Sequence, residues 1–109
     1  MSKVIKDAEA YLKLFIQTSS HFQRKALLDT ITTDQVKALC EITHNLLQGN
    51  INVSDNKLRP LLKHQTFIRS LGNPKVSLKE KKKLVCCRAP ILLKLLKVCQ
   101  PTLGQIWTK

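Results

Sequence analysis

Aromatic residues, glycine and acidic side chains are all scarce in this chain of 109 residues. Phe, Trp and Tyr make up 5% of the sequence against 43% hydrophobic residues in all, so the core must be mostly aliphatic. Gly49, Gly72 and Gly104 stand alone, which excludes a glycine-rich loop that cradles the phosphates of a nucleotide. No apolar run approaches the roughly 18 residues of a membrane span, so a transmembrane helix is not expected.

A secretory signal is not expected either. The N-terminal pattern "MSKVIKDAEAYLKLF" carries Asp7 and Glu9 where a signal peptide has an uncharged apolar segment. Without a secretory context, the even number of cysteines does not imply disulfides. The sequence therefore predicts an intracellular, reducing environment.

The positive charge of +12 is confined to one half of the chain. Residues 1 to 56 hold six basic and six acidic side chains, whereas residues 57 to 109 hold thirteen basic ones and a single acid, Glu80. Such asymmetry indicates a polyanionic partner, either nucleic acid or an anionic membrane, although a solvated lysine-rich face without a partner is the plain alternative.

Apolar residues recur with helical spacing along the whole chain, and no alternating strand pattern occurs. We therefore predict an all-α fold, a compact bundle of five to six short helices. The single domain would span residues 1–109, with a neutral half 1–56 and a basic half 57–109. The predicted helices cover residues 3–18, 21–31, 33–48, 55–71, 78–88 and 90–99.

Several residues mark where these helices begin and end. Ser19 or Ser20 suits the cap of the second helix, Thr32 with Gln35 forms a capping box for the third, and Gly49 suits a left-handed C-cap. Further helix signals are Ser54 or Asp55, Pro60, the Ser77–Glu80 capping box and Pro90, while Pro101 and Gly104 should stop the last helix. The second helix should turn Phe22, Ala26, Leu27 and Ile31 inward, and the third Val36, Leu39, Cys40, Thr43, Leu46 and Leu47.

Catalytic signatures are weak. Cys40 and His44 lie four residues apart on one predicted helix, the spacing of a nucleophile and a base, but nothing identifies an orienting group or an oxyanion hole. The pattern favours a buried thiol beside a half-exposed histidine. No enzymatic activity and no cofactor are expected.

A zinc site would have to draw on Cys40, His44, Cys86, Cys87 and Cys99. Structural zinc sites normally use paired ligands two to five residues apart, and only Cys40 and His44 have such a spacing. The adjacent Cys86 and Cys87 would point about 100° apart on a helix. No metal site is expected.

The basic residues of the second half are the strongest functional signal. Two neighbouring predicted helices would present a stripe of cations able to follow a phosphate backbone and release its counterions. The predicted nucleic-acid-binding residues are Lys57, Arg59, Lys63, Arg69, Lys75, Lys79, Lys81, Lys82, Lys83 and Arg88. Lysine dominates this set, which favours binding without base readout. The run "KEKKK" also matches a nuclear-import pattern.

Two further hypotheses concern other segments. The stretch "QRKALLDTITTDQVKALCEI" resembles a helix–turn–helix, but Asp34 and Glu41 would place acids on its reading helix. The last predicted helix is apolar except for Lys94 and Lys97, so it is either the core helix or a membrane-active segment, with core as the default. In the membrane or partner-binding alternative the contacts would be Leu92, Leu93, Leu95, Leu96 and Trp107.

The stretches "QRKALLDTITTDQVKALCEITHNLLQGNI" and "LLKHQTFIRSLGNPKVSLKEKKKLV" resemble a family of small basic proteins encoded by Maverick/Polinton transposons and adintoviruses. The resemblance covers residues 22 to 85. It departs in the tail, because family members follow the lysine cluster with a glycine-rich hydrophobic stretch, and "CCRAPILLKLLKVCQP" has no Gly-Gly pair.

This resemblance implies a virion core or accessory protein, similar in role to the small adenoviral proteins that condense genomic DNA, and located in the virion or the host nucleus. Together with the charge pattern it predicts a nucleic-acid partner, DNA rather than RNA, with a possible homo-oligomer and no membrane contact. The alternative is a helical interaction or assembly module that forms a homodimer or docks a protein partner.

Overall fold

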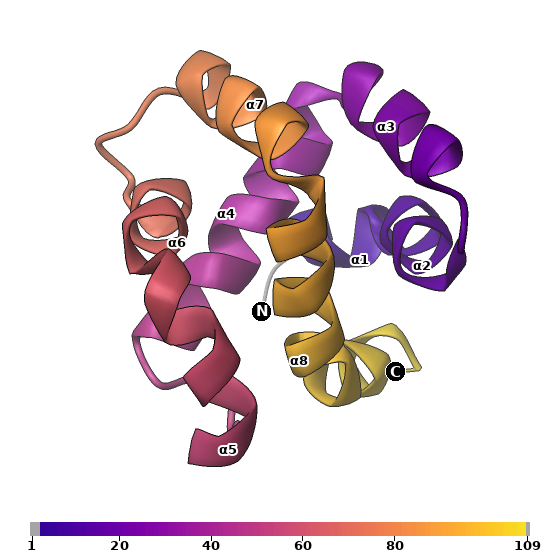
Figure 1. The fold of residues 1–109 in the computed structure, drawn as a ribbon. Coiled ribbons are helices and arrows are strands. Elements are labelled where there is room, and N and C mark those ends of the chain that lie inside the picture. Colours follow the sequence, from indigo (N-terminus) through magenta and orange to yellow (C-terminus); the bar gives the residue numbers. More distant parts are fainter. Residues whose placement is uncertain (1–2, 109) are drawn as a thin grey trace.

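Helix α4 (Thr33–Leu47) runs through the middle of the molecule, and α1, α6, α7 and α8 pack against it (Figure 1). The structure is a computed structural model that describes residues 3–108. In this range every regular element is a helix, as predicted, and the principal extents are 32 × 31 × 27 Å. The elements are α1 (Lys3–Asp7), α2 (Glu9–Gln17), α3 (His21–Asp29), α4, α5 (Asp55–Leu58), η1 (Arg59–His64), α6 (Gln65–Gly72), α7 (Leu78–Cys87) and α8 (Ala89–Trp107).

The first predicted helix is divided into α1 and α2 at Ala8, whose φ and ψ are −89° and 4°. The bend allows the two pieces to pack on different partners. α1 contacts α4 and buries Ile5 completely, whereas α2 contacts α8 and buries Leu12, Phe15 and Ile16. A straight helix would direct both apolar stripes at one partner.

Helix α3 corrects one prediction about the core. Phe22 is 89% exposed and Ala26 is exposed, while Leu28 is buried and Arg24 is only 8% exposed. Arg24, Leu28 and Ile31 follow the i, i+4, i+7 spacing of one helical face, and this face packs inward. The aliphatic stem of Arg24 therefore occupies a place that the sequence assigned to Phe22.

The predicted caps are largely confirmed. The Ser20 hydroxyl accepts the Gln23 amide, and Thr32 with Gln35 forms a complete capping box at 2.9 and 3.2 Å. Gly49 has φ of 76°, the left-handed conformation expected of a helix C-cap. The Ser77 hydroxyl accepts the Glu80 amide at 3.2 Å, which is one of the two bonds of the predicted capping box. Ser54 precedes α5 as predicted but makes no side-chain cap bond.

The core stripe of α4 matches only in part. Val36, Leu39 and Thr43 are buried as predicted, but Cys40 and Leu46 are half-buried and Leu47 is 45% exposed. Ala38 and Ile42 are buried as well. The reason is that α4 contacts α1, α6, α7 and α8, so helices cover it on more than one side.

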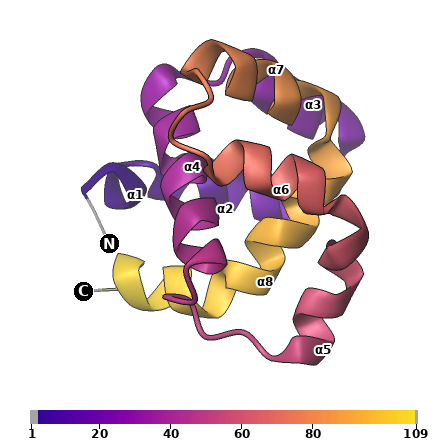
Figure 2. The ribbon, with the colours of Figure 1, turned by 90° about the vertical axis from the view of Figure 1, so that its left-hand side faces the viewer.

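The fourth predicted helix is divided into α5, η1 and α6. Pro60 lies in the first turn of η1, where its missing N–H and fixed φ suit the start of a new element. α6 then packs closely on α4: a Cβ atom on Gly72 would lie 2.8 Å from Leu47 Cδ1 and 3.3 Å from the His44 amide nitrogen. Gly72 therefore permits the close approach of the two helices, which Figure 2 shows crossing.

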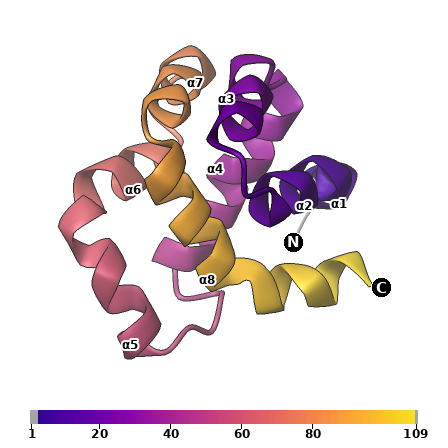
Figure 3. The same cartoon turned by 45° about the vertical axis from the view of Figure 1, so that its right-hand side comes forward.

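Helix α8 is longer than predicted and continues through Pro101 to Trp107. Proline inside a helix removes one backbone hydrogen bond and bends the helix, and Figure 3 shows α8 turning toward the C-terminus. The segment after the bend is held by Leu103, which is fully buried, and by Trp107, whose Nε1–H donates to the Ile5 carbonyl at 3.1 Å. These contacts stabilise a helical segment after Pro101 that the sequence alone predicts to be a loop.

Candidate nucleic-acid interface

The predicted nucleic-acid-binding residues are almost all on the surface. Their side chains are exposed on α5, η1, α6, the loop before α7, α7 itself and the junction of α7 with α8. The exposed members are Lys57, Arg59, Lys63, Arg69, Lys75, Lys79, Lys82, Lys83 and Arg88.

Lys81 is the exception, and its assignment to the interface is wrong. Its side chain is 3% exposed, because Leu78, Lys81 and Val85 share the face of α7 that packs inward. The i, i+3, i+7 spacing of these residues is the sequence signal that distinguishes Lys81 from its neighbours.

Lys81 lines a pocket of about 270 Å³ between α4, α6 and α7 together with Cys40, Glu41 and His44. Burial raises the pKa of the Cys40 thiol, and the nearby Lys81 ammonium opposes this rise. The His44 ring is engaged elsewhere, since its Nδ1 lies 3.3 Å from the Gly72 carbonyl. The arrangement places His44 at the α4–α6 contact, with Cys40 beside it in the pocket of Lys81.

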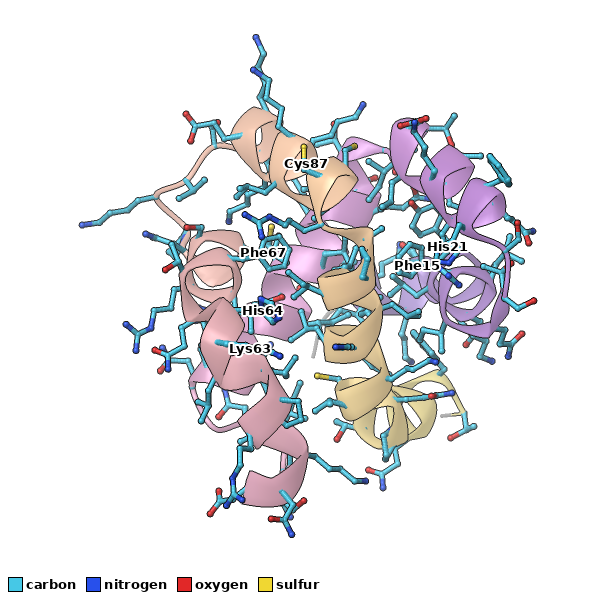
Figure 4. The ribbon with its side chains drawn as sticks, in the orientation of Figure 1. Phe15, His21, Lys63, His64, Phe67 and Cys87 are labelled. Carbon is cyan, nitrogen blue, oxygen red and sulfur yellow. The ribbon has the colours of Figure 1, made fainter. Side chains whose placement is uncertain are left out.

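Side chains from η1, α6 and α7 meet in a hollow of about 230 Å³, which we call the α6–α7 notch. Lys63 and Arg88 bring positive charge to it from elements that are distant in sequence, and His64, Thr66 and Ser70 add further hydrogen-bond donors. Phe67 and Leu84 form its apolar base. Figure 4 places Lys63, His64 and Phe67 to one side of α8.

A larger hollow of about 400 Å³, the α3–α8 groove, lies on the other side of α8, where Figure 4 shows His21. Its α3 wall carries His21, Arg24 and Lys25, and its α8 wall carries Lys94 and Lys97. Between these walls the lining includes Cys86, Ala89, Pro90 and Leu93, and no acidic residue lines it among the residues that the structure describes. The sequence prediction missed this site because its two walls are far apart along the chain.

Arg88 lines the notch and the adjacent Ala89 lines the groove, so the α7–α8 junction contributes to both hollows. Acidic residues gather elsewhere: Asp7 and Asp34 line a hollow of about 210 Å³ between α1 and α4. The segregation of charge along the sequence is only partly one in space, since Glu41 lines the pocket of Lys81 and Lys25 of the neutral half lines the groove.

The helix–turn–helix hypothesis has little support from the geometry. α3 and α4 are joined by a three-residue connection, as such a motif requires. However, α4 is the central helix and buries Val36, Ala38, Leu39 and Ile42 against its neighbours. A reading helix must project into the major groove, and α4 is not free to do so.

The leucines of the membrane hypothesis lie in the core. Leu92, Leu95 and Leu96 are at most 1% exposed, and Leu93 is half-buried. Trp107 is half-buried and bonded to α1 through the Ile5 carbonyl. The default prediction of a core helix is therefore confirmed for α8, and none of the helices described is long and apolar enough to cross a membrane.

An exposed apolar surface exists instead at the end of α4 and on η1. Leu47 and Leu62 are 45% and 56% exposed, and both line a hollow of about 260 Å³ that also contains Leu58. This surface is the one that an assembly module would use.

The cysteines are free thiols, with Cys87 exposed and Cys99 buried. In residues 3–108 no group of three or more His, Cys, Asp or Glu side chains converges as metal ligands would. No family model matches the chain, and no curated protein or solved structure gives a significant match.

Proposed function

We propose that this domain binds nucleic acid without strong sequence preference through the α6–α7 notch and the exposed lysines of α7. The observation that carries the proposal is the notch itself. Lys63 on η1 and Arg88 at the end of α7 line one hollow together with Thr66 and Ser70. All four side chains are able to donate hydrogen bonds, as phosphate oxygens require.

The lysines of α7 extend this site. Lys79, Lys82 and Lys83 are exposed on the helix that forms one side of the notch, and Glu80 is the single acid between them. A row of exposed cations beside a hollow lined by hydrogen-bond donors suits a polyanion better than a single small anion. Each cation that neutralises a phosphate releases counterions, which makes the affinity depend steeply on salt.

The composition of the surface favours binding that tolerates many sequences. Lysine acts as a point charge toward phosphate, whereas base recognition relies mainly on bidentate Arg, Asn and Gln in a groove. The central position of α4 also removes the one helix that resembles a reading helix. The role that agrees with these features and with the family resemblance is DNA condensation in a virion core or by a mobile-element accessory protein, in the virion or the nucleus.

A salt titration with labelled duplex DNA and RNA tests the proposal. We expect binding at low ionic strength that weakens steeply with added salt. The double variant Lys63→Glu/Arg88→Glu should lower the slope of log affinity against log salt by about 2, since each lost phosphate contact removes about 1. Lys79→Glu/Lys82→Glu/Lys83→Glu should weaken binding further and leave Lys81 in the core.

The matched control is Lys3→Glu/Lys6→Glu on α1, which changes the net charge as much as Lys63→Glu/Arg88→Glu but on the neutral half. It should retain most of the affinity. Equal losses in the control and in the notch variant would contradict a defined interface. Absence of binding at low salt, combined with a mass that rises with concentration in light scattering, would favour the assembly alternative and its leucine surface.

A further inference from the structure

We propose that the α3–α8 groove is a docking site for an acidic amphipathic helix of a protein partner. The proposal is independent of nucleic-acid binding, because none of the cations on the groove walls belongs to the notch or to the exposed row of α7. It concerns a second surface with a different chemistry.

The groove combines an apolar floor with cations along both walls. Leu93 is half-buried and lines the floor beside Pro90, while Lys25 rises from α3 and Lys94 and Lys97 from α8. A phosphate backbone would leave the apolar floor without contacts, and a purely hydrophobic peptide would leave the cations unpaired. An amphipathic helix with acidic residues on both sides of an apolar stripe matches both features.

The spacing of the cations agrees with a helical partner. Lys94 and Lys97 are three residues apart on α8, so this wall presents its two ammonium groups about one helical turn, or 5.4 Å, from each other, and Lys25 adds a cation on the α3 wall. Acidic side chains at i and i+3 or i+4 on a docked helix repeat with the same rise.

The α3 wall is fixed in place before any partner arrives. The Arg24 guanidinium is bonded to the Thr18 carbonyl at 2.5 Å and lies 3.3 Å from His21 Nδ1, which ties α3 to the end of α2. On the opposite side the Cys86 thiol donates to the Leu28 carbonyl at 3.4 Å and ties α7 to α3. A preformed groove binds without a large ordering cost.

The groove has a volume of about 400 Å³, which is large enough to accept apolar side chains of a docked helix. Two copies of the protein placed groove to groove would oppose like charges, so a symmetric dimer through this surface is disfavoured. The occupant is therefore a partner of opposite charge.

The experiment uses a labelled synthetic peptide of about 15 residues, long enough to form a helix on binding, with a leucine stripe flanked by glutamates one turn apart. A peptide of the same composition with the stripe scrambled is the control ligand. Anisotropy should show tighter binding of the amphipathic peptide, and amide NMR shifts should change most along His21–Lys25 and Pro90–Lys97.

Lys94→Glu/Lys97→Glu should lower the affinity for the amphipathic peptide by roughly tenfold, because the variant replaces two attractive contacts by repulsive ones. Leu93→Ser should weaken it without changing the charge, and circular dichroism verifies that each variant remains folded. Lys82→Glu/Lys83→Glu makes the same charge change on the outer face of α7. It should leave the affinity for the peptide nearly unchanged while it weakens the binding of DNA.

Three results would overturn the proposal. The first is equal affinity for the scrambled peptide, and the second is equal loss in the α7 variant; both would indicate general attraction of acidic chains to a basic protein. The third is duplex DNA that displaces the peptide and shifts the same groove amides, which would assign the groove to nucleic acid. Failure of DNA binding in the notch variants leaves the peptide assay unaffected, so the two proposals fail separately.

Discussion

Helices α7 and α8 are joined at Arg88, but they place their lysines in opposite ways. α7 is short and rich in lysine, and it buries one of them, Lys81, to 3% exposure. α8 is long and rich in leucine, and it exposes both of its lysines, Lys94 and Lys97, along the wall of a groove. The comparison shows that position on a helix, more than the composition of the helix, decides which cations are available to a partner.

The cause is the same in both helices. In α7 the inward face needs a residue between Leu78 and Val85, and the long stem of Lys81 fills that place. In α8 the inward face is filled by leucines, so the remaining positions of each turn are left for lysine. A lysine run is therefore not a continuous surface, and a leucine run is not only core.

The largest expected effect comes from reversing the charge at the buried lysine. Lys81→Glu places a carboxylate in the pocket that Glu41 also lines, and we expect it to lower the free energy of unfolding by about 3–5 kcal/mol or to abolish folding. Chemical denaturation measures the change. Lys82→Glu, one position further on the exposed face, should remain within about 0.5 kcal/mol of wild type.

Lys81→Met separates the charge of Lys81 from its packing. Methionine keeps a long flexible apolar stem and removes the buried ammonium, so its cost should stay below about 1.5 kcal/mol. If Lys81→Glu were as well tolerated as Lys82→Glu, the two faces of α7 would not differ in burial.

A smaller effect is expected for the two faces of α8. Leu95 is fully buried and Leu93 is half-buried. Leu95→Ala should therefore destabilise the protein by about 2–5 kcal/mol through lost burial and a residual cavity. Leu93→Ala should cost clearly less, since part of its side chain already contacts solvent, and equal losses in urea denaturation would show that α8 has no outward face at this position.

Much of the fold is predictable from the sequence because its signals are local. Ser20, Thr32 with Gln35, and Gly49 act within one helical turn of themselves, and each is confirmed. The aliphatic composition and the helical spacing likewise predict an all-α domain. These features depend on neighbours in the chain and do not require knowledge of the packing.

The features that could not be predicted depend on contacts between distant segments. Pro101 normally ends a helix, but the burial of Leu103 and the bond of Trp107 to Ile5 offset its cost of about 3 kcal/mol. The α3–α8 groove forms only when α3, which carries Lys25, and α8, which carries Lys94, lie side by side, and these helices are far apart along the chain. Lys81 and Phe22 are intermediate cases. Helical spacing indicates that Lys81 faces inward and Phe22 outward, whereas residue type alone suggests the reverse.

The smallest effect concerns the cysteines, which repeat the contrast between the helices. Cys87 at the end of α7 is exposed, whereas Cys99 in α8 is fully buried, and burial raises the pKa of the Cys99 thiol to about 12. In the unfolded chain the Cys99 thiol loses its proton near the ordinary pKa of about 8.5. The contribution of this thiol to the free energy of unfolding is therefore fully present below that pH and is lost as the pH rises toward 12. Between pH 9 and 10 the contribution of this one proton is about 1 kcal/mol.

Urea denaturation of the wild type and of Cys99→Ala at pH 7, 9 and 10 measures this contribution. The variant should be less stable at pH 7 because it leaves a cavity, but its stability should fall less between pH 9 and 10 than that of the wild type. Burial also raises the pKa of Tyr11 and of Cys86, and these groups act equally in both proteins, so the difference in slope isolates Cys99. Iodoacetamide should label Cys87 in the folded protein and Cys99 only after unfolding; identical slopes with Cys99 labelled early would place Cys99 at the surface and remove the contrast between α7 and α8.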